Sequence, residues 1–477
     1  MAAASSPTTL RSLAERFAPA AHDAWLALVE RTLKGAGLES LERRTIEGLS
    51  IRPLYEPAAD APLLQGASPG WEIRTLVAAP DPAAANAEAL ADLEGGADSI
   101  LVRLAGRGRD GVLAASPAAF ARIFESVLLD AAPVALDAGF AGVWAAGELA
   151  AAAKGAPAAR LALHLDPLSA FAEAGRSPGP IEAHLAASAA AAMRLAEPYP
   201  RATFFLASGR AAHEAGAGEA AELAVALAAA IAYARALAAA GADPADAFGR
   251  IVLGLAADAD LWLGVAKLRA ARLLWSKVAG ACGSAAPARI EARSSARMLT
   301  RADPWTNLIR LTAAGFAAAV GGADAVVLGG FTDALGPPSA FARRQGRNAQ
   351  LILRDEAGLG RVADPAAGAG AAEAMTGALA RLAWSKLQEI ERAGGLGSAL
   401  QAGLAARMAA VGREELARRI GAREMRILGV TDHPPAEARP IPLGAPAPEG
   451  HPAPEFHAEG PDSLCPALTQ VRLETLA

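Results

Sequence analysis

A short apolar run followed by a helix-forming stretch occurs eight times between residues 70 and 353. This alternation predicts parallel strands, each joined to the next by a helix, and eight such units close into a (β/α)8 or TIM barrel, of α/β class. The predicted strands span residues 73–78, 99–104, 133–137, 161–166, 203–208, 251–256, 289–294 and 325–329. Such barrels carry their chemistry at the carboxyl ends of the strands, so functional side chains are expected there.

The 477 residues suffice for one large barrel with appendages or for about three average domains, and the pattern favours one barrel. We predict an N-terminal arm over 1–65, the barrel with its following helices over 66–430, and a Pro/Gly/Ala-rich linker or tail over 431–477. Beyond the eighth strand, helices are predicted over 339–354, 371–392 and 398–426. These extra helices are expected to pack on the outside of the barrel or on a partner.

Composition excludes several classes of protein. The net charge is −5 and basic residues are scattered among acidic ones, so no basic face for nucleic acid is expected. Cys282 and Cys465 form no CxxC pair, which fits a reducing compartment and argues against structural zinc. The start of the chain lacks the apolar core of a secretory signal; its Ser, Thr and Arg residues suit a transit peptide or a capped surface helix. The expected location is the cytoplasm.

One long apolar stretch, residues 220–240, invites comparison with a membrane span. It is mostly alanine and is interrupted by Glu222 and Arg235, whereas crossing a bilayer takes about 20 strongly apolar residues. Alanine is the strongest helix former, so the stretch is predicted to be a buried barrel helix. No membrane association is expected.

The segment GRGRDG at 106–111 matches GxGxxG after a predicted strand, and Asp137 ends the next strand as a ribose-binding acid would. A dinucleotide site needs these glycines to open the helix, so that the pyrophosphate meets free amide groups. The helix is instead predicted to begin at Ser116 and Pro117. A turn is therefore the favoured interpretation, and a dinucleotide site the alternative.

Other candidates stand at the ends of predicted strands. His164 and Asp166 are two residues apart, so both would face the barrel mouth if the strand alternates regularly; alternatively, His164 points into the barrel wall and Asp166 caps the next turn. His213, beside Glu214, is a possible general base or a helix cap. The tail histidines lack metal-binding spacing. The candidates at the barrel mouth are Asp137, His164, Asp166, His213 and Arg293, and the tail histidines are His433, His451 and His457.

Five long segments carry a family resemblance. They read LASGRAAHEAGAGEAAELAVALA, LGVAKLRAARLLWSKV, RMLTRADPWTNLIRLTAAGFAAAVGGADAV, FARRQGRNAQLILRDEAGLGRVADPAAG and LARLAWSKLQEIERAGG. Together they closely resemble the methylmalonyl-CoA mutase family, whose barrel binds an acyl-CoA and whose adenosylcobalamin generates a radical. The earlier segments LKGAG, ERRTIEGLSIRPLYEP and GWEIRTLV look like the small, non-catalytic subunit of heterodimeric members. The resemblance covers about residues 25–426.

The sequence departs from the catalytic pattern of that family at two places. Active members carry a Tyr-His pair in a context like SGYHMQEAGA, and here these positions are Arg210 and Ala211. Alanine cannot donate a hydrogen bond to an acyl thioester, and His213 falls where the pattern has Gln. A second motif, resembling RGPYATMY in the first strand, is absent around WEIRTLVAAPDP. The resemblance therefore implies no catalytic residue in this chain.

The cofactor motif is also missing. In the family, a DxHxxG motif in a flavodoxin-like domain lets a histidine coordinate cobalt, and no DxHxxG occurs in this sequence, which ends about where the linker would enter that domain. TDHPPA at 431–436 has an Asp-His pair without the spacing. We therefore expect the chain alone to hold no cofactor or metal, and adenosylcobalamin to be bound by a partner in the assembled enzyme.

Three hypotheses follow. The first, which we favour, is a scaffold subunit of a methylmalonyl-CoA mutase that docks a catalytic large subunit as a heterodimer; whether acyl-CoA still enters its barrel stays open. The second is the substrate-binding chain of an active acyl-CoA mutase whose cobalamin domain is a separate protein. The third is an unrelated barrel enzyme that binds a dinucleotide through residues 106–111.

Overall fold

The computed structural model describes residues 21–64, 70–106, 109–437, 439–446 and 460–477. The chain divides into two compact units, Met1–Tyr55 and Glu56–Ala477. In the first unit, helix α1 (His22–Leu33) is followed by a short 3₁₀ helix (Leu38–Leu41) and by the antiparallel pair β1 (Arg43–Arg44) and β2 (Ser50–Ile51). Gly48 has a φ of +81° in the connecting turn, a conformation that glycine adopts without strain.

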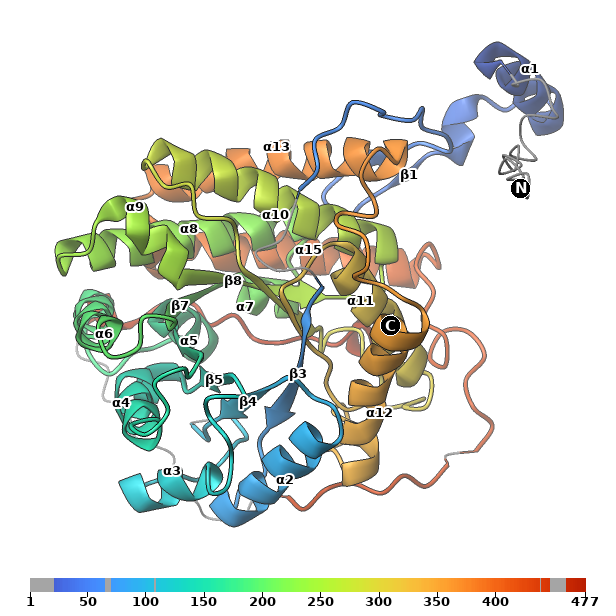
Figure 1. Ribbon diagram of the computed structural model, residues 1–477. Helices are drawn as coiled ribbons and strands as arrows, with labels where there is room; N and C mark the ends of the chain where they lie inside the picture. The colour runs from blue at the N-terminus through green and yellow to red at the C-terminus, as the bar shows by residue number, and fades with distance from the viewer. Residues whose placement is uncertain (1–20, 65–69, 107–108, 438, 447–459) are drawn as a thin grey trace, which may run out of the picture. The chain divides into compact units, whose positions relative to one another are not determined.

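The second unit contains a closed barrel in which every strand is parallel to both neighbours, in the order β10-β3-β4-β5-β6-β7-β8-β9 (Figure 1). The strands are β3 (Glu72–Val77), β4 (Ser99–Arg103), β5 (Val134–Asp137), β6 (Leu161–Leu165), β7 (Thr203–Ser208), β8 (Ile251–Ala257), β9 (Ile290–Ser294) and β10 (Ala325–Val327). The predicted (β/α)8 barrel is confirmed, and each observed strand overlaps a predicted one.

Helices surround this barrel. They are α2 (Pro82–Glu94), α3 (Pro117–Ile123), α4 (Gly142–Ala152), α5 (Pro167–Ala174), α6 (Ile181–Ala196), α7 (Arg210–Glu214), α8 (Glu219–Ala239), α9 (Pro244–Ala247), α10 (Leu261–Ala281), α11 (Asn307–Val320), α12 (Ala340–Leu351), α13 (Gly370–Arg392), α14 (Leu396–Gln401) and α15 (Leu404–Gly421). Short 3₁₀ segments lie at Gly139–Ala141, Phe248–Arg250, Pro461–Ser463 and Leu473–Leu476, and a π-helical turn spans Ile352–Glu356. Several helices begin at an Asp or Ser whose side chain accepts a hydrogen bond from the first turn, as Ser116 does for α3.

The apolar stretch predicted as a barrel helix is α8. Within the described residues it is the one helix long and apolar enough to cross a membrane, and 78% of its apolar window is buried inside the protein. It packs on β7 and β8 on one side and on α13 on the other. Phe205 of β7 stacks on Tyr233 of α8 with ring centroids 4.4 Å apart. This burial explains the low charge of the helix.

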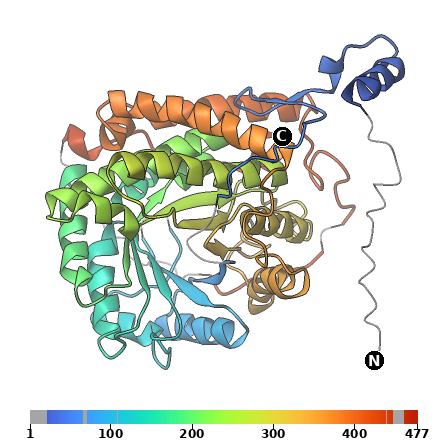
Figure 2. The same cartoon turned by 45° about the horizontal axis from the view of Figure 1, so that its top comes forward.

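The helices beyond the eighth strand form a second layer. Helix α13 lies over α8 and α10, outside the helices that cover the barrel (Figure 2). Buried Arg269 of α10 joins the two layers, because its guanidinium binds Asp364 at 2.9 Å and Glu373 at 2.7 Å. The helix predicted over 398–426 is wrong in one respect: α14 and α15 are separate helices, divided at Gly403, which has a φ of +71°.

The end of the chain is bound to the carboxyl end of the barrel. The amide of Leu468 donates to Ala172 O at 2.7 Å, that of Val471 to Glu214 O at 2.8 Å, and that of Leu473 to Arg297 O at 3.0 Å. These acceptors follow strands β6, β7 and β9. The described part of the tail therefore links three of the loops in which a barrel of this class carries its function.

Replacing Leu473 should test how firmly this segment is held. Leu473 is 7% exposed, so Leu473→Ala should lower the free energy of unfolding by roughly 2–3 kcal/mol. Leu464, which is 49% exposed in the same segment, provides the control, since Leu464→Ala should change little. Urea denaturation of both variants measures the difference. Equal, small effects would mean that the segment does not contribute to stability.

Candidate functional site

Charged side chains run along the axis of the barrel from its amino end to its carboxyl end. Arg74 and Glu291 are inward-facing residues of β3 and β9, and each is bound by opposite charges on both sides. Acidic and basic groups alternate in this series, which we call the axial ladder. Its ion pairs are Arg160–Glu72 (2.9 Å), Glu72–Arg74 (2.8 Å), Arg74–Glu291 (2.5 Å), Glu291–Arg293 (2.6 Å), Arg293–Asp137 (2.8 Å), Asp137–Arg103 (3.2 Å) and Asp137–Arg109.

An apolar layer shares the axis with the ladder. Leu101, Ala135 and Val327 form a buried cluster, with Leu76 and Ala162 packed against it. Each lies two residues along its strand from another inward-facing position, because alternate residues of a strand face the same side. The barrel interior is therefore filled by side chains that contact one another, both charged and apolar.

The arginines of the ladder favour the ionised form of Glu291. Burial alone would raise the pKa of Glu291, but the charges of Arg293 and Arg74 outweigh burial and hold it below its ordinary value. Burial also lowers the pKa of His164 to about 4, so this imidazole is neutral at pH 7. Its Nδ1 lies 4.0 Å from Glu291 Oε2, and neither ring nitrogen has a hydrogen-bond partner among the described residues.

His164 and Asp166 do not share a site. The pairing of β6 with β7 shifts register between Ala162 and Leu165, and His164 has a φ of +44°, so regular strand alternation does not apply here. His164 lies beside Glu291 in the barrel, whereas Asp166 caps α5 by accepting from the Ser169 amide at 3.1 Å. Asp166 also accepts from the Tyr233 hydroxyl at 2.5 Å. Asp166 is therefore a helix cap, as the second of the two interpretations of the sequence predicted.

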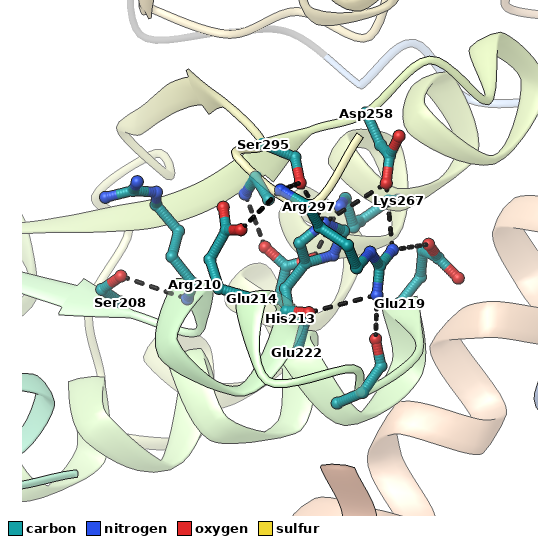
Figure 3. A network of polar contacts seen from close by, with 12 residues as sticks. Ser208, Arg210, His213, Glu214, Glu219, Glu222, Asp258, Lys267, Ser295 and Arg297 are labelled. Atoms are coloured by element: carbon teal, nitrogen blue, oxygen red, sulfur yellow. Dashed lines mark hydrogen bonds and ion pairs between the residues drawn. The ribbon is translucent and has the colours of Figure 1, made fainter. Parts of the chain in front are cut away.

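His213 lies in a separate buried network (Figure 3). Its Nε2 is 2.9 Å from Ser295 Oγ and 3.4 Å from Asp258, and its Nδ1 is 3.2 Å from Glu222. Glu222 is also bound by Lys267 at 2.6 Å, and Asp258 by Arg297 at 3.0 Å. We call these residues the His213 network.

Local chain geometry assembles this network. The short helix α7 directly after β7 carries His213, and the first turn of α8 carries Glu222. Asp258 and Ser295 are the residues that immediately follow β8 and β9. Glu214 accepts from the amides of Ala296 and Arg297 at 3.1 and 2.9 Å, which fastens the loop after β9 to α7. Three strand ends therefore converge on one imidazole.

The contacts of His213 resemble those of a Ser-His-acid triad, in which a histidine takes the proton of a serine nucleophile. Here His213, Glu222 and Ser295 are all fully buried, with no exposed surface. Ser295 Oγ also accepts from the Arg297 amide at 3.2 Å. A nucleophile must reach a substrate, and none of these three side chains is exposed to one here. The network joins the loops at the carboxyl ends of β7, β8 and β9.

Nearby carboxylates raise the pKa of the His213 imidazole. Burial and Arg297 lower the pKa of His213, but Glu222 and Asp258 raise it to a net value above 6.5. Burial would raise the pKa of Glu222, but Lys267 and His213 outweigh that effect and lower it to about 2. The two carboxylates beside His213 therefore favour its protonated form.

Arg210 and Ala211 form the first turn of α7. The Arg210 amide donates to Ser208 Oγ at 3.2 Å, and its guanidinium points away from the His213 network (Figure 3). Ala211 is buried. Arg293, the remaining candidate, belongs to the axial ladder with Asp137.

The described residues of the GxGxxG segment do not begin a helix. Gly106 pairs with Arg109, and α3 begins only at Pro117, as predicted. Residues 107 and 108 lie outside the described residues. Asp137, the would-be ribose ligand, is already bound by three arginines. The two features that suggested a dinucleotide site, glycines that open a helix and a free acidic group, are therefore not found among the described residues at this position.

The tail histidines form no metal site in the part of the chain that the structure describes. His433 is exposed, and His451 and His457 lie outside the described residues. Within the described ranges, no group of three or more His, Cys, Asp or Glu side chains is arranged to hold a metal ion.

The sequence alone indicated five candidates at the mouth but not most of their partners. Charged residues inside apolar runs were the available signal: Arg74 and Glu291 stand within strands, and Glu222 within an alanine-rich helix. A charge at a predicted core position needs a partner, because burying it alone is costly. The identity of each partner depended on the tertiary structure.

The charge on His213 should make stability depend on pH above neutrality. Because its folded pKa is raised above 6.5, the stabilisation is complete below pH 6.5 and is lost as pH rises through the folded pKa. A tenfold difference in proton affinity between the folded and unfolded states corresponds to about 1.4 kcal/mol of stability. Urea unfolding between pH 6 and 9 should show this loss in the parent protein and not in His213→Gln. The exposed His433→Gln provides the control, and parallel curves for all three proteins would contradict the assignment.

The buried carboxyl group of Asp166 should lower the stability of the protein once it is ionised. Burial raises its pKa to about 7 from an ordinary value of 3.8, so stability is lost as pH rises from about 4 to 7. Asp166→Asn keeps the oxygen that accepts from Ser169 and Tyr233 but removes the charge. The variant should gain stability relative to the parent over that range, by about 1.4 kcal/mol or more.

Asp81→Asn is the matched control for Asp166→Asn, because Asp81 caps α2 in the same way at an exposed position. Its stability difference from the parent measures what the loss of an exposed capping carboxylate does at each pH. A difference for Asp166→Asn that follows the Asp81→Asn difference between pH 4 and 7 would show that Asp166 is not held in a charge-excluding site.

Comparison with known proteins agrees with this architecture. The family model described as "Methylmalonyl-CoA mutase" matches residues 68–449. The chain is 38% identical to the methylmalonyl-CoA mutase small subunit of Streptomyces virginiae, over 90% of this chain and 73% of the relative. It is 37% identical to a probable small subunit of Mycobacterium tuberculosis (85% and 68%) and 32% identical to the small subunit of Propionibacterium freudenreichii subsp. shermanii (91% and 72%). With the barrel and these matches together, the chain belongs to the methylmalonyl-CoA mutase family.

Proposed function

We propose that this chain is the non-catalytic, small subunit of an adenosylcobalamin-dependent methylmalonyl-CoA mutase, and that the interconversion of methylmalonyl-CoA and succinyl-CoA takes place in a larger partner chain. The observation that carries the proposal is the axial ladder. Relatives that match most of the chain are themselves named small subunits.

The ladder occupies the part of the barrel where a substrate would need to lie. In barrels of this class the reacting groups surround the carboxyl ends of the strands. There, Asp137 is already bound by Arg103, Arg109 and Arg293. Removing one partner of a buried ion pair typically costs about 3–5 kcal/mol, so displacing this set by a neutral acyl group is unfavourable.

Replacement of the Tyr-His pair points the same way. Ala211 has no group that hydrogen-bonds to a thioester carbonyl, and Arg210 places a positive charge at the barrel mouth. His213 does not compensate, because its imidazole is fully buried between Ser295, Glu222 and Asp258. The side chains that this family uses for chemistry are thus replaced, and the nearest imidazole has a structural role.

The described residues do not fit the cofactor. In this family a histidine of a DxHxxG motif coordinates cobalt. The candidate segment here places Asp432 beside His433, but Asp432 accepts from Thr431 Oγ1 at 2.9 Å and two prolines follow the histidine. Adenosylcobalamin, which supplies the radical that abstracts a substrate hydrogen, is therefore assigned to the partner.

Helix α1 suits a role in docking. Its apolar side chains Trp25, Leu28, Val29 and Leu33 follow helical spacing, yet the helix has no buried residue. Permanent interfaces between subunits are apolar and commonly exceed about 2,000 Å². An apolar helix of this kind fits the surface of a large, permanent partner, as the heterodimer requires.

Purification under mild conditions tests the proposal. The tagged chain, isolated from its own cells, should be recovered with an equal amount of a larger mutase chain, as measured by intact-complex mass spectrometry. Bound adenosylcobalamin, measured by absorbance after the two chains are separated, should remain with the larger one. Recovery with only a small cobalamin-binding protein, together with mutase turnover by that pair, would overturn the proposal and make this barrel the catalyst.

A further inference from the structure

We propose that the mouth of this barrel binds a small oxyanion, a phosphate or carboxylate group, through Arg210 and Arg293. The inference goes beyond the scaffold role and does not depend on it, because it concerns a ligand of this chain rather than the mutase reaction.

Four guanidinium groups surround one carboxylate at the mouth. Asp137 Oδ2 accepts from Arg293 Nη1 at 2.8 Å and from Arg103 Nε at 3.2 Å, and Asp137 Oδ1 accepts from Arg109. Both oxygens of Asp137 are therefore engaged before Arg210 is considered. The four arginines therefore carry more positive charge than Asp137 alone can balance.

Two of the arginines keep unsatisfied donors. Arg293 is 4% exposed, and its Nη2 is buried without a hydrogen-bond partner among the described residues. The same holds for Arg210 Nε. A buried donor of a charged group that lacks an acceptor costs free energy, and an oxyanion supplies the acceptors that both atoms need.

Nearby carboxylates do not satisfy Arg210. Glu214 is close enough to raise the pKa of Arg210, but its two oxygens accept from the amides of Ala296 and Arg297. Glu291 is shared between Arg74 and Arg293. Four arginines at the mouth thus share the charges of Asp137, Glu214 and part of Glu291, so positive charge remains in excess.

Electrostatics agree with the geometry. Burial lowers the pKa of Arg210, and repulsion from Arg293 lowers it further. Burial would raise the pKa of Asp137, but Arg109, Arg293, Arg103 and Arg210 together hold it well below its ordinary value. The four arginines thus interact with one carboxylate and repel one another. A second anion would reduce that repulsion.

A further acid, Asp333, does not cancel this excess. Burial raises the pKa of Asp333 to about 7 although the charge of Arg103 lowers it, so a large fraction of Asp333 is protonated near neutral pH. Its Oδ1 is buried without a partner in the described part of the chain. In the protonated form this oxygen is able to donate to an anion.

Solvent reaches the mouth. The side chains of Arg103 and Arg109 are 27% and 24% exposed, and that of Asp137 is 18% exposed. A small ion has access from the carboxyl end of the barrel, whereas the ladder below Arg293 is closed by Glu291 and Arg74. Planar guanidinium groups bind phosphate and carboxylate through paired hydrogen bonds, which selects these anions over chloride.

Inorganic phosphate is the probe for this site. Titration of the full chain, in the assembly in which it purifies, should give a dissociation constant on the order of 1 mM or tighter by calorimetry at constant ionic strength. Arg210→Gln should weaken phosphate binding about tenfold or more, since it removes one charged donor. Asp137→Asn should change affinity in the opposite direction, because it frees three arginines.

Arg194→Gln is the control, since Arg194 is an exposed residue of helix α6. It should leave phosphate affinity unchanged. Absence of phosphate binding, or equal weakening by Arg194→Gln and Arg210→Gln, would overturn the proposal. Should Asp137→Asn fail to fold, the comparison of the two arginine variants still decides the question.

The anion has two possible sources, a free ion or the phosphate of a larger ester. Repeating the titration with coenzyme A present separates them. Competition that depends on Arg210 identifies a phosphate ester, and phosphate binding unaffected by coenzyme A identifies the free ion. Neither result depends on mutase turnover, so failure of this inference and failure of the scaffold proposal are distinguishable.

Discussion

The axial ladder is the interaction on which the rest of the barrel depends. Arg74 on β3 and Glu291 on β9 are buried charges whose partners come from other strands. A shift of one residue in either strand would turn its charge toward the helices and leave its partner unpaired. Because an unpaired buried charge is so costly, the ladder specifies the strand register as strongly as the apolar residues do.

The His213 network acts in the same way at the carboxyl end. It joins α7, α8 and α10 to the residues that follow β8 and β9, and the end of the chain binds to two of the same loops. Such a set of buried contacts favours one rigid arrangement of the loops. The arginines around Asp137 are the exception, with donors that no described residue satisfies.

Much of the fold was predictable because its signals are local. The strands are apolar runs between turns and helices, and Ser116 and Ser339 begin helices where the sequence placed them. The site was predictable only in part. His164 and Asp166 separate because His164 adopts a positive φ, and His213 is buried because Glu222, Asp258 and Ser295 converge on it. Neither the positive φ of His164 nor the distant partners of His213 can be predicted from the residue type and its neighbours in the sequence.

By itself, the sequence determined the barrel and its family, because periodicity and residue identity are properties of the chain. Only the tertiary structure decided what the charged residues do. Arg74, Asp137, Glu291 and Arg293 lie far apart in the sequence, and their pairing exists only once the barrel closes. Long-range electrostatics depend on distances across the barrel axis, and closure of the sheet sets those distances.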